Sequence, residues 1–538
     1  MSDNTAAYPQ TNQQQSGKHA LLVAAGIFLS RIFGLVRARV FAYYFGQTWP
    51  ADAFNAAFRI PNMLQNLFGE GALSASFIPV YAKLLAQDDE EEAGRVAGAI
   101  FAILALVVAA LVLLGIFAAP WLVGLIAVGF TGEKRELTVQ IVRVLFPGTG
   151  LLVLSAWCLG ILNSHKRFFL SYVSPVLWNL AIIASLFIFG HKNASDMQLG
   201  GLAMMAAWGS VAGSAIQFGA QLPAVFRLVK RLRVAFDIKS AQVRTVVRNF
   251  LPAFVSRGVI QISAFVDQGI ASFLGDGAVT ALTNAQILYT LPVSLFGMSV
   301  SAVELAAMSG AVGDSAEINA QLRQRLNNGM QRIAFFIVPS AVAFLTLGNV
   351  IVGALLQSGR FTAADSNYVW AILAGSSIGL LASTLARLNS STYYALQDTR
   401  TPLKFAIVRV TLGMILGYIF ALYAPRWFGL EAKWGAAFLT AASGLAGWTE
   451  FLLLRRQLNS RIGRTGLPFI YMVKLWSAAF LGSAIAWAVK LGVGPRHPLP
   501  LAVIVLAPYG LTYFILTAAF GVAEARAFTG RFSRLVKR

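Results

Sequence analysis

About fourteen apolar stretches, each long enough to cross a lipid bilayer, dominate this sequence of 538 residues. A transmembrane helix needs about 20 mainly apolar residues. The stretches are expected at residues 19–45, 51–81, 94–127, 137–163, 168–190, 199–226, 243–274, 278–310, 330–357, 366–395, 401–424, 432–455, 466–490 and 499–522. Hydrophobic residues make up 57% of the chain and charged residues only 12%. Because lipid cannot satisfy backbone polar groups, these stretches predict an all-α polytopic membrane protein.

The predicted helices divide into two lobes of six helices and two extra C-terminal helices. We expect a disordered N-terminal tail at 1–17, an N-lobe at 18–226, a basic cytoplasmic linker at 227–242, a C-lobe at 243–458, and helices 13–14 with a basic tail at 459–538. Prolines lie inside apolar runs of both lobes, where they break the helical backbone ladder. Two six-helix lobes with broken helices are typical of a rocking transporter whose site lies at the interface between its halves.

The charges outside the spans predict an orientation. Lys and Arg gather in the even-numbered connections and at both termini, which predicts that both termini are cytoplasmic. The formal net charge is +21. Since the basic residues flank apolar spans, anionic lipid headgroups are expected as their partners, and nucleic acid is not. The acidic run DDEEE at 88–92 is expected to be a solvated cytoplasmic segment.

Ionisable residues inside the first two spans indicate a function. Residues 30–81 contain Arg31, Arg37, Arg39, Asp52, Arg59 and Glu70 among apolar neighbours. A charge at membrane depth costs about 2.5–3.5 kcal/mol on insertion scales, so such residues normally face a cavity and are used. Arg39 and Glu70 also fit positions near helix ends, where long side chains reach the interface. We expect the other charges in this stretch to line a cationic cavity between the halves.

The chemistry of the remaining residues favours transport over catalysis. The sequence has no P-loop, dinucleotide fingerprint, GxSxG or HExxH motif, so an enzymatic role is not expected. Further charges fall within or near spans at Arg143, Arg257, Asp267, Glu304, Arg387, Arg409, Glu450 and Lys474. Arg409 and Lys474 are expected to have structural roles. The excess of arginine favours an anionic substrate such as a lipid-linked diphosphate, because guanidinium groups bind phosphate through paired donors.

Several co-linear motifs make the chain similar to a known family. They are SRIFGLVR at 30–37, DAFNAAFRIPN at 52–62, FGEGALSASFIPVY at 68–81, GILNSHKRF at 160–168, SPVLWNL at 174–180, LQSGRFTAADS at 356–366 and YYALQDTRTPLK at 393–404. In this order and at this spacing they resemble the MurJ (MviN) lipid II flippase family of the multidrug/oligosaccharidyl-lipid/polysaccharide exporter (MOP) superfamily. The resemblance covers nearly the whole chain.

The resemblance implies a fold, a substrate and a set of site residues. It implies fourteen helices in two lobes that open alternately and move the undecaprenyl-diphosphate-linked peptidoglycan precursor from the inner to the outer leaflet, in peptidoglycan biosynthesis and cell-shape maintenance. The expected substrate-binding residues are Arg31, Arg37, Asp52, Arg59, Asn62, Glu70, Arg257 and Arg387. Arg257 is included because the family's eighth-helix arginine is missing from ALTNAQILYTLP at 281–292, and a neighbouring helix can supply that charge.

Other functions stay open at this point. One alternative is a flippase for another polyprenyl-diphosphate oligosaccharide, of the O-antigen or exopolysaccharide type, and another is a non-transporting pseudo-flippase scaffold. A cation-coupled drug antiporter would call for acidic cavity residues. No cofactor or metal is expected, and the energy source is either the membrane potential or a monovalent cation. Expected partners are the lipid-linked precursor, membrane lipids and cell-wall synthesis proteins, in the bacterial cytoplasmic membrane.

Overall fold

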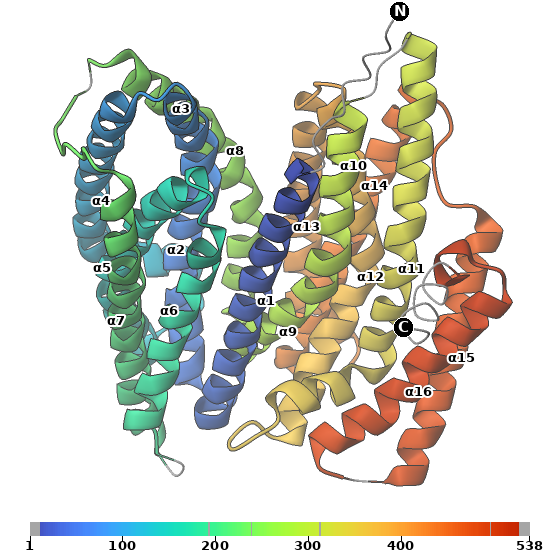
Figure 1. Ribbon diagram of the computed structural model, residues 1–538. Coiled ribbons are helices and arrows are strands. Elements are labelled where there is room, and N and C mark those ends of the chain that lie inside the picture. The colour runs from blue at the N-terminus through green and yellow to red at the C-terminus, as the bar shows by residue number, and fades with distance from the viewer. Residues whose placement is uncertain (1–10, 192–193, 238, 311–313, 495, 527–538) are drawn as a thin grey trace, which may run out of the picture. The chain divides into compact units, whose positions relative to one another are not determined.

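The computed structural model describes residues 11–191, 194–237, 239–310, 314–494 and 496–526 (Figure 1). Within the helices, the side chains of residues 11–24, 61, 69–71, 252–253, 255–262 and 315 are outside this description. The chain divides into two compact units. Unit 1 comprises Met1–Tyr44, Trp49–Ile126 and Phe130–Gln261, and unit 2 comprises Phe45–Thr48, Ala127–Gly129 and Ile262–Arg538.

The units are built from helices. Most of unit 1 consists of α1 (Thr11–Phe45), α2 (Trp49–Gln65), η1 (Asn66–Leu73), α3 (Ser74–Ala86), α4 (Glu90–Ile126), α5 (Gly132–Ser164), α6 (Phe168–Phe189), α7 (Asp196–Leu228) and the larger part of α8 (Ala241–Ala271). Unit 2 continues with α9 (Ala278–Pro292), η2 (Val293–Met298), α10 (Ser299–Ser309), α11 (Ser315–Leu356), α12 (Ala363–Ala395), α13 (Arg400–Trp427), η3 (Ala432–Trp434), α14 (Gly435–Ile462), α15 (Phe469–Val493) and α16 (Pro498–Ala519).

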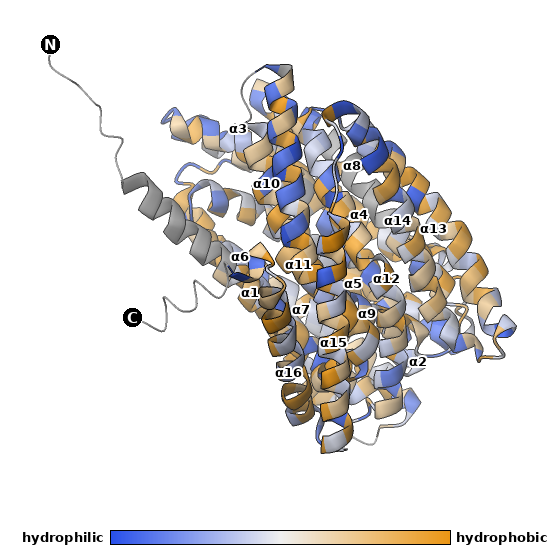
Figure 2. Cartoon of the chain, turned by 90° about the vertical axis from the view of Figure 1, so that its right-hand side faces the viewer, coloured by the Kyte–Doolittle hydropathy of each residue, from blue (hydrophilic) through white to orange (hydrophobic). Residues whose placement is uncertain are grey.

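These helices confirm the predicted all-α membrane fold. Within the described ranges, eleven helices are long and apolar enough to cross a membrane, and Figure 2 shows hydrophobic residues along most of their length. The chain is therefore a multi-pass membrane protein. The remaining predicted spans fall on α1, on α2 to α3, and on α8, so the count of fourteen stays a prediction.

One predicted boundary was wrong. The span expected from residue 330 belongs to α11, which already begins at Ser315. The first turns of α11 are too polar to be recognised as part of a membrane span, yet they belong to the same helix. Asp314 caps this extension, because its carboxylate accepts the backbone N–H of Glu317 at 2.7 Å. α11 is therefore longer than the apolar stretch at its C-terminal end.

Two π-helical segments interrupt otherwise continuous helices. η1 joins α2 to α3, and η2 joins α9 to α10. Each falls in the second helix of its predicted set of six. A π-helical turn widens the helix locally and often marks a functional position. The matching positions in the two sets are what an internal structural repeat would produce.

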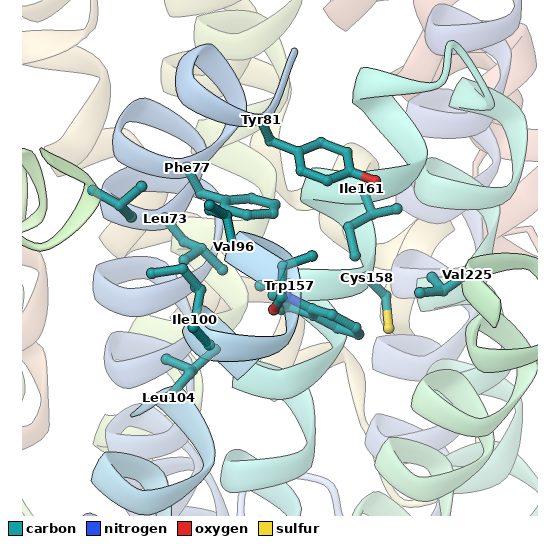
Figure 3. Packing of buried hydrophobic residues seen from close by; sticks show 14 of the residues in the cluster. Leu73, Phe77, Tyr81, Val96, Ile100, Leu104, Trp157, Cys158, Ile161 and Val225 are labelled. Carbon is teal, nitrogen blue, oxygen red and sulfur yellow. The ribbon is translucent and has the colours of Figure 1, made fainter. Parts of the chain in front are cut away.

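The core of unit 1 is a cluster from η1, α3, α4, α5, α7 and the start of α8 (Figure 3). Trp157 and Cys158 of α5 lie at its centre, with Phe77 of α3 and Ile100 of α4 packed into the same cluster. The Trp157 indole N–H donates to the carbonyl of Ala97 at 3.1 Å, so its polar atom is satisfied. Of the most apolar part of α5, 72% of residues are buried. This helix therefore anchors unit 1.

Helices α12 and α14 of unit 2 approach closely through glycine. A Cβ on Gly379 of α12 would overlap the Cα of Gly444 of α14, so a larger residue does not fit there. Such small-residue contacts let helix backbones pack closely in membranes, where no hydrophobic force drives helices together. The contact fixes the distance between two helices that carry charged residues further along, Arg387 and Glu450.

The basic linker between α7 and α8 lies on the first turns of α4. The backbone of Arg231 and Arg233 approaches Gly94 and Gly98 so closely that a Cβ on either glycine would overlap a linker carbonyl oxygen. Ion pairs add to this contact, with Glu91 carboxylate oxygens 3.0 Å from Arg231 and 3.5 Å from Arg233. The acidic run is exposed, as predicted, but it also holds the linker.

Asp398 organises the corner between α12 and α13. One carboxylate oxygen accepts the backbone N–H groups of Arg400 and Thr401, each at 3.0 Å. The other accepts the Thr401 hydroxyl at 2.7 Å and lies 2.8 Å from the Arg461 guanidinium. These hydrogen bonds, with those from Thr401 contributing most, lower the pKa of Asp398 from 3.8 to about 2. The ionised carboxylate thus fixes the start of α13 and ties it to α14.

This lowered pKa predicts a pH dependence of stability. A carboxyl whose pKa is lower in the folded state stabilises that state above its unfolded pKa and loses this contribution as pH falls through the folded pKa. The stability advantage of the wild type over Asp398→Asn should be constant above about pH 5 and shrink between about pH 4 and 2. Thermal unfolding in detergent across this range measures it. An advantage that is undiminished at the lowest pH would contradict the assignment.

Candidate functional site

Four polar residues share one face of α2. Asp52, Asn55, Arg59 and Asn62 follow one another at intervals of three, four and three residues, which places them in one row along the helix. The intervening residues Phe54 and Phe58 are buried. The sequence predicted Asp52, Arg59 and Asn62 as site residues, and Asn55 is an additional member of the row. This face gives unit 1 a polar stripe on a helix that is otherwise apolar.

Asp52 is held by an ion pair with α5. Its carboxylate is fully buried and lies 2.8 Å from the ammonium of Lys134, which is only 13% exposed. The same ammonium lies 4.2 Å from the centre of the Phe130 ring, a favourable cation–π distance. Asp52 therefore has a structural contact between α2 and α5. The sequence placed Lys134 in a connection and gave no signal that it would meet a residue 82 positions away.

Arg37 of α1 lies against two aromatic rings. Its guanidinium carbon lies 5.1 Å from the ring centres of both Phe58 and Trp178. These two rings are stacked, with centres 5.4 Å apart. The Trp178 indole N–H donates to the carbonyl and the hydroxyl of Ser210, which fixes the indole. The aromatic pair therefore orients the guanidinium of Arg37.

The donors of Arg37 are not all used. Its Nη1 atom is buried and has no hydrogen-bond partner in the part of the chain that the structure describes. A buried donor without an acceptor costs about 1–3 kcal/mol, and more for a charged group. A cation–π contact recovers only part of this cost. The arrangement thus holds a positively charged group, poor in hydrogen bonds, ready to donate to an anion.

The other predicted site residues differ in burial, and two of them lie outside the described side chains. Arg31 is exposed, and six positions along a helix with 3.6 residues per turn put it on a different face of α1 from Arg37. Arg59 and Asn62 are half-buried on the polar face of α2. Glu70 on η1 and Arg257 on α8 have side chains outside the described part, so their roles stay predictions.

Unit 2 carries its own polar face on α12. Ser383, Arg387, Ser390 and Tyr394 follow at intervals of four, three and four residues, and Arg387 is exposed. The Ser383 hydroxyl lies 2.7 Å from the hydroxyl of Tyr289 on α9. Of this group, the sequence predicted only Arg387 as a site residue. The serines and tyrosines were missed because these residue types are common in any transmembrane helix.

Two charged residues accompany Arg387. Arg409 of α13 lies 3.4 Å from the buried carboxylate of Glu450 on α14, and both interact electrostatically with Arg387. The structural role predicted for Arg409 is confirmed by this pair. The ammonium of Lys474, for which a structural role was also predicted, donates to the Phe520 carbonyl at 2.6 Å. Arg387 is therefore the basic residue of this cluster that is most available to a ligand.

Asp267 on the last turns of α8 also belongs to unit 2. Its carboxylate accepts a long hydrogen bond, 3.5 Å, from the Ser443 hydroxyl of α14. Asp267 is half-buried and has interactions within the chain.

The contact between Asp52 and Lys134 predicts a stability effect. Lys134→Met keeps the aliphatic stem but removes the ammonium beside a fully buried carboxylate, and breaking a buried pair costs about 3–5 kcal/mol. The double variant Asp52→Asn with Lys134→Met should recover most of this loss. Unfolding in mixed micelles gives the free energies.

The control is the exposed pair of Lys433 and Glu431, whose side chains are 43% and 71% exposed. Lys433→Met should change stability by no more than about 1 kcal/mol, since surface ion pairs contribute little. Equal losses in Lys134→Met and Lys433→Met would show that the buried pair is not a stabilising contact.

Sequence comparisons show that the chain is similar to one family of membrane proteins. The family model described as "Lipid II flippase MurJ" matches residues 41–516. A relative from Burkholderia cenocepacia named "Lipid II flippase MurJ" is 31% identical over 82% of this chain and 84% of its own length. A "Probable lipid II flippase MurJ" from Rhizobium meliloti is 30% identical over 92% of this chain and 91% of its own length.

Solved structures give the same result at the level of fold. The structure titled "Lipid II flippase MurJ, inward closed conformation" aligns with a TM-score of 0.76 and 25% identity, over 93% of this chain and 98% of its own. An inward-facing MATE transporter of the MOP superfamily aligns with a TM-score of 0.64 and 17% identity, over 82% and 98%, and supports the fold alone. With the family model matching most of its length, the chain belongs to the MurJ family of lipid II flippases.

Proposed function

We propose that this chain is a lipid II flippase, which moves the undecaprenyl-diphosphate-linked peptidoglycan precursor from the inner to the outer leaflet by alternating access. Its membership of the MurJ family and the names of its relatives support this function. The MurJ family is a family of transporters. The eleven apolar helices within the described ranges support a membrane location.

The observation that carries the proposal is the environment of Arg37. A diphosphate bears several oxygens that accept hydrogen bonds, and a planar guanidinium can donate to two of them at once. The buried Nη1 atom of Arg37 has no acceptor in the described structure. Desolvation by Phe58 and Trp178 makes the donation to an anion stronger than it would be in water. Phosphate binding would remove the cost of the unused donor.

The remaining site residues receive roles within this proposal. Arg59 and Asn62, on the same face of α2, would add a cation and an amide for the headgroup, and Arg31 a further cation. Arg387 would contribute a cation from unit 2. Glu70 and Arg257 keep the roles that the family resemblance implies, Arg257 in place of the eighth-helix arginine. Asp52 contributes through its pair with Lys134, which positions α2.

The location, orientation and energy source belong to the same proposal. We propose that the chain works in the bacterial cytoplasmic membrane, and the distribution of Lys and Arg in the sequence predicts that both termini are cytoplasmic. The lipid-linked precursor and membrane lipids are its partners, together with cell-wall synthesis proteins. Coupling to the membrane potential or to a monovalent cation would bias the cycle, since one charge crossing the membrane is worth about 2.3 kcal/mol per 100 mV.

The test is complementation of a bacterial host depleted of its own flippase. The wild-type chain should restore growth and prevent lipid II from accumulating in the inner leaflet. Arg37→Ala should fail, and Arg37→Lys should be impaired because an ammonium keeps the charge but loses the planar pair of donors. Arg95→Ala is the control, since the Arg95 side chain is 51% exposed and its ion pair within the described residues is with Glu92, three positions earlier on α4.

Two results would count against the proposal. If the wild-type chain is inserted in the membrane but restores export of another polyprenyl-linked oligosaccharide and not of lipid II, the substrate is wrong. If Arg37→Ala supports growth as well as Arg95→Ala at equal protein levels, Arg37 does not bind the headgroup.

A further inference from the structure

A polar pocket lies where α15 begins and α16 ends. Its cavity measures about 330 Å³ and is lined by residues of α11, of the start of α15, and of the segment that follows α16. α15 and α16 form an antiparallel hairpin that packs on α11 through Ala486, Val505 and Leu347 (Figure 1). The volume falls in the range of small-molecule sites, about 300–1,000 Å³. The pocket belongs wholly to unit 2 and does not involve any residue of the proposed headgroup site.

A positive group lines one part of this pocket. Lys474 is half-buried, and its ammonium donates one hydrogen bond, to the carbonyl of Phe520 at the end of α16. A basic group is favourable at a helix C-terminus, so the contact orients the side chain. An ammonium has three N–H donors. Within the described residues, the other two donors of Lys474 have no acceptor, and they can donate to an anionic ligand.

A negative group lines the same pocket. Glu524 has one carboxylate oxygen, Oε2, that is buried and accepts no hydrogen bond within the described residues. The described part of the structure has no ion pair between Glu524 and Lys474. The Tyr471 hydroxyl donates to the Gln331 carbonyl at 3.0 Å and lies beside the Glu524 carboxylate, and its oxygen can still accept a hydrogen bond. The pocket thus offers hydrogen-bond acceptors beside the Lys474 ammonium, and Lys474 and Glu524 do not form an ion pair within the described residues.

The surroundings indicate what kind of molecule reaches the pocket. Phe469 and Ile470, in the first turn of α15, are 81% and 68% exposed. Large apolar side chains that are exposed at the end of an apolar hairpin face the lipid. A ligand with acyl chains could therefore lie along these side chains while its polar headgroup enters the pocket.

We propose that this pocket binds the headgroup of a phospholipid with a primary amine, of the phosphatidylethanolamine type. The lipid phosphate would accept from Lys474, and the lipid ammonium would donate to Glu524 and Tyr471. A choline headgroup has the same net charge but no N–H donor, so it leaves the buried Glu524 oxygen without a hydrogen bond. An anionic phosphatidylglycerol headgroup brings no cation to the carboxylate.

The experiment compares three lipids on the purified full-length chain. Phosphatidylethanolamine, phosphatidylcholine and phosphatidylglycerol with identical acyl chains are added in detergent, and the bound lipid is quantified by native mass spectrometry. The amine lipid should bind about tenfold more tightly than the choline lipid, since hydrogen bonds to charged groups are worth that factor or more. Glu524→Gln should reduce this preference to about twofold or less.

A matched control is Glu431→Gln, which alters a carboxylate that is 71% exposed in the connection before α14. It should leave the preference unchanged. Equal binding of amine and choline lipids to the wild type would overturn the proposal, as would a preference for phosphatidylglycerol. The comparison on the wild type needs no variant, so it decides the question even if Glu524→Gln does not fold. Retention of the preference in a folded Glu524→Gln would overturn the assigned role of Glu524.

Discussion

The cost of placing charge among apolar helices governs this structure. A buried carboxylate is stable only with a cation beside it. Asp52 meets this condition through Lys134, and Glu450 meets it through Arg409. Arg37 differs from these two carboxylates, because aromatic rings lie against its guanidinium and one of its donors has no acceptor in the described structure. A ligand can accept the hydrogen bond that a charged group does not make within the fold. Arg37 is therefore the centre of the proposed headgroup site.

Close backbone contacts at glycines set the spacing of the elements that carry charged residues. The glycine contact between Gly379 and Gly444 sets the spacing of two helices that carry Arg387 and Glu450. In unit 1, Gly94 and Gly98 admit the backbone of the basic linker onto α4. Membrane helices gain little from excluding lipid, so such contacts and a few ion pairs must fix their packing. The charged residues are held by helices whose separations are set by small residues.

Much of this arrangement could be predicted from the sequence. Apolar length located the helices because the bilayer requires it, and the rarity of charge at membrane depth singled out Arg37 and Arg59. The start of α11 was missed because a helix can extend beyond its apolar part. The partners were missed for a different reason. Neither Lys134 nor Trp178 has a local pattern that predicts its contact, since both contacts depend on how distant helices pack.

Binding of lipid II by the purified chain tests the central claim most directly. The account predicts that the wild type binds lipid II in detergent, that inorganic diphosphate competes, and that Arg37→Ala binds at least about tenfold more weakly, since charge-assisted hydrogen bonds are lost. The variant should unfold at a temperature close to that of the wild type, because the removed donor was unsatisfied without ligand. Equal affinity of a folded Arg37→Ala for lipid II would contradict the account.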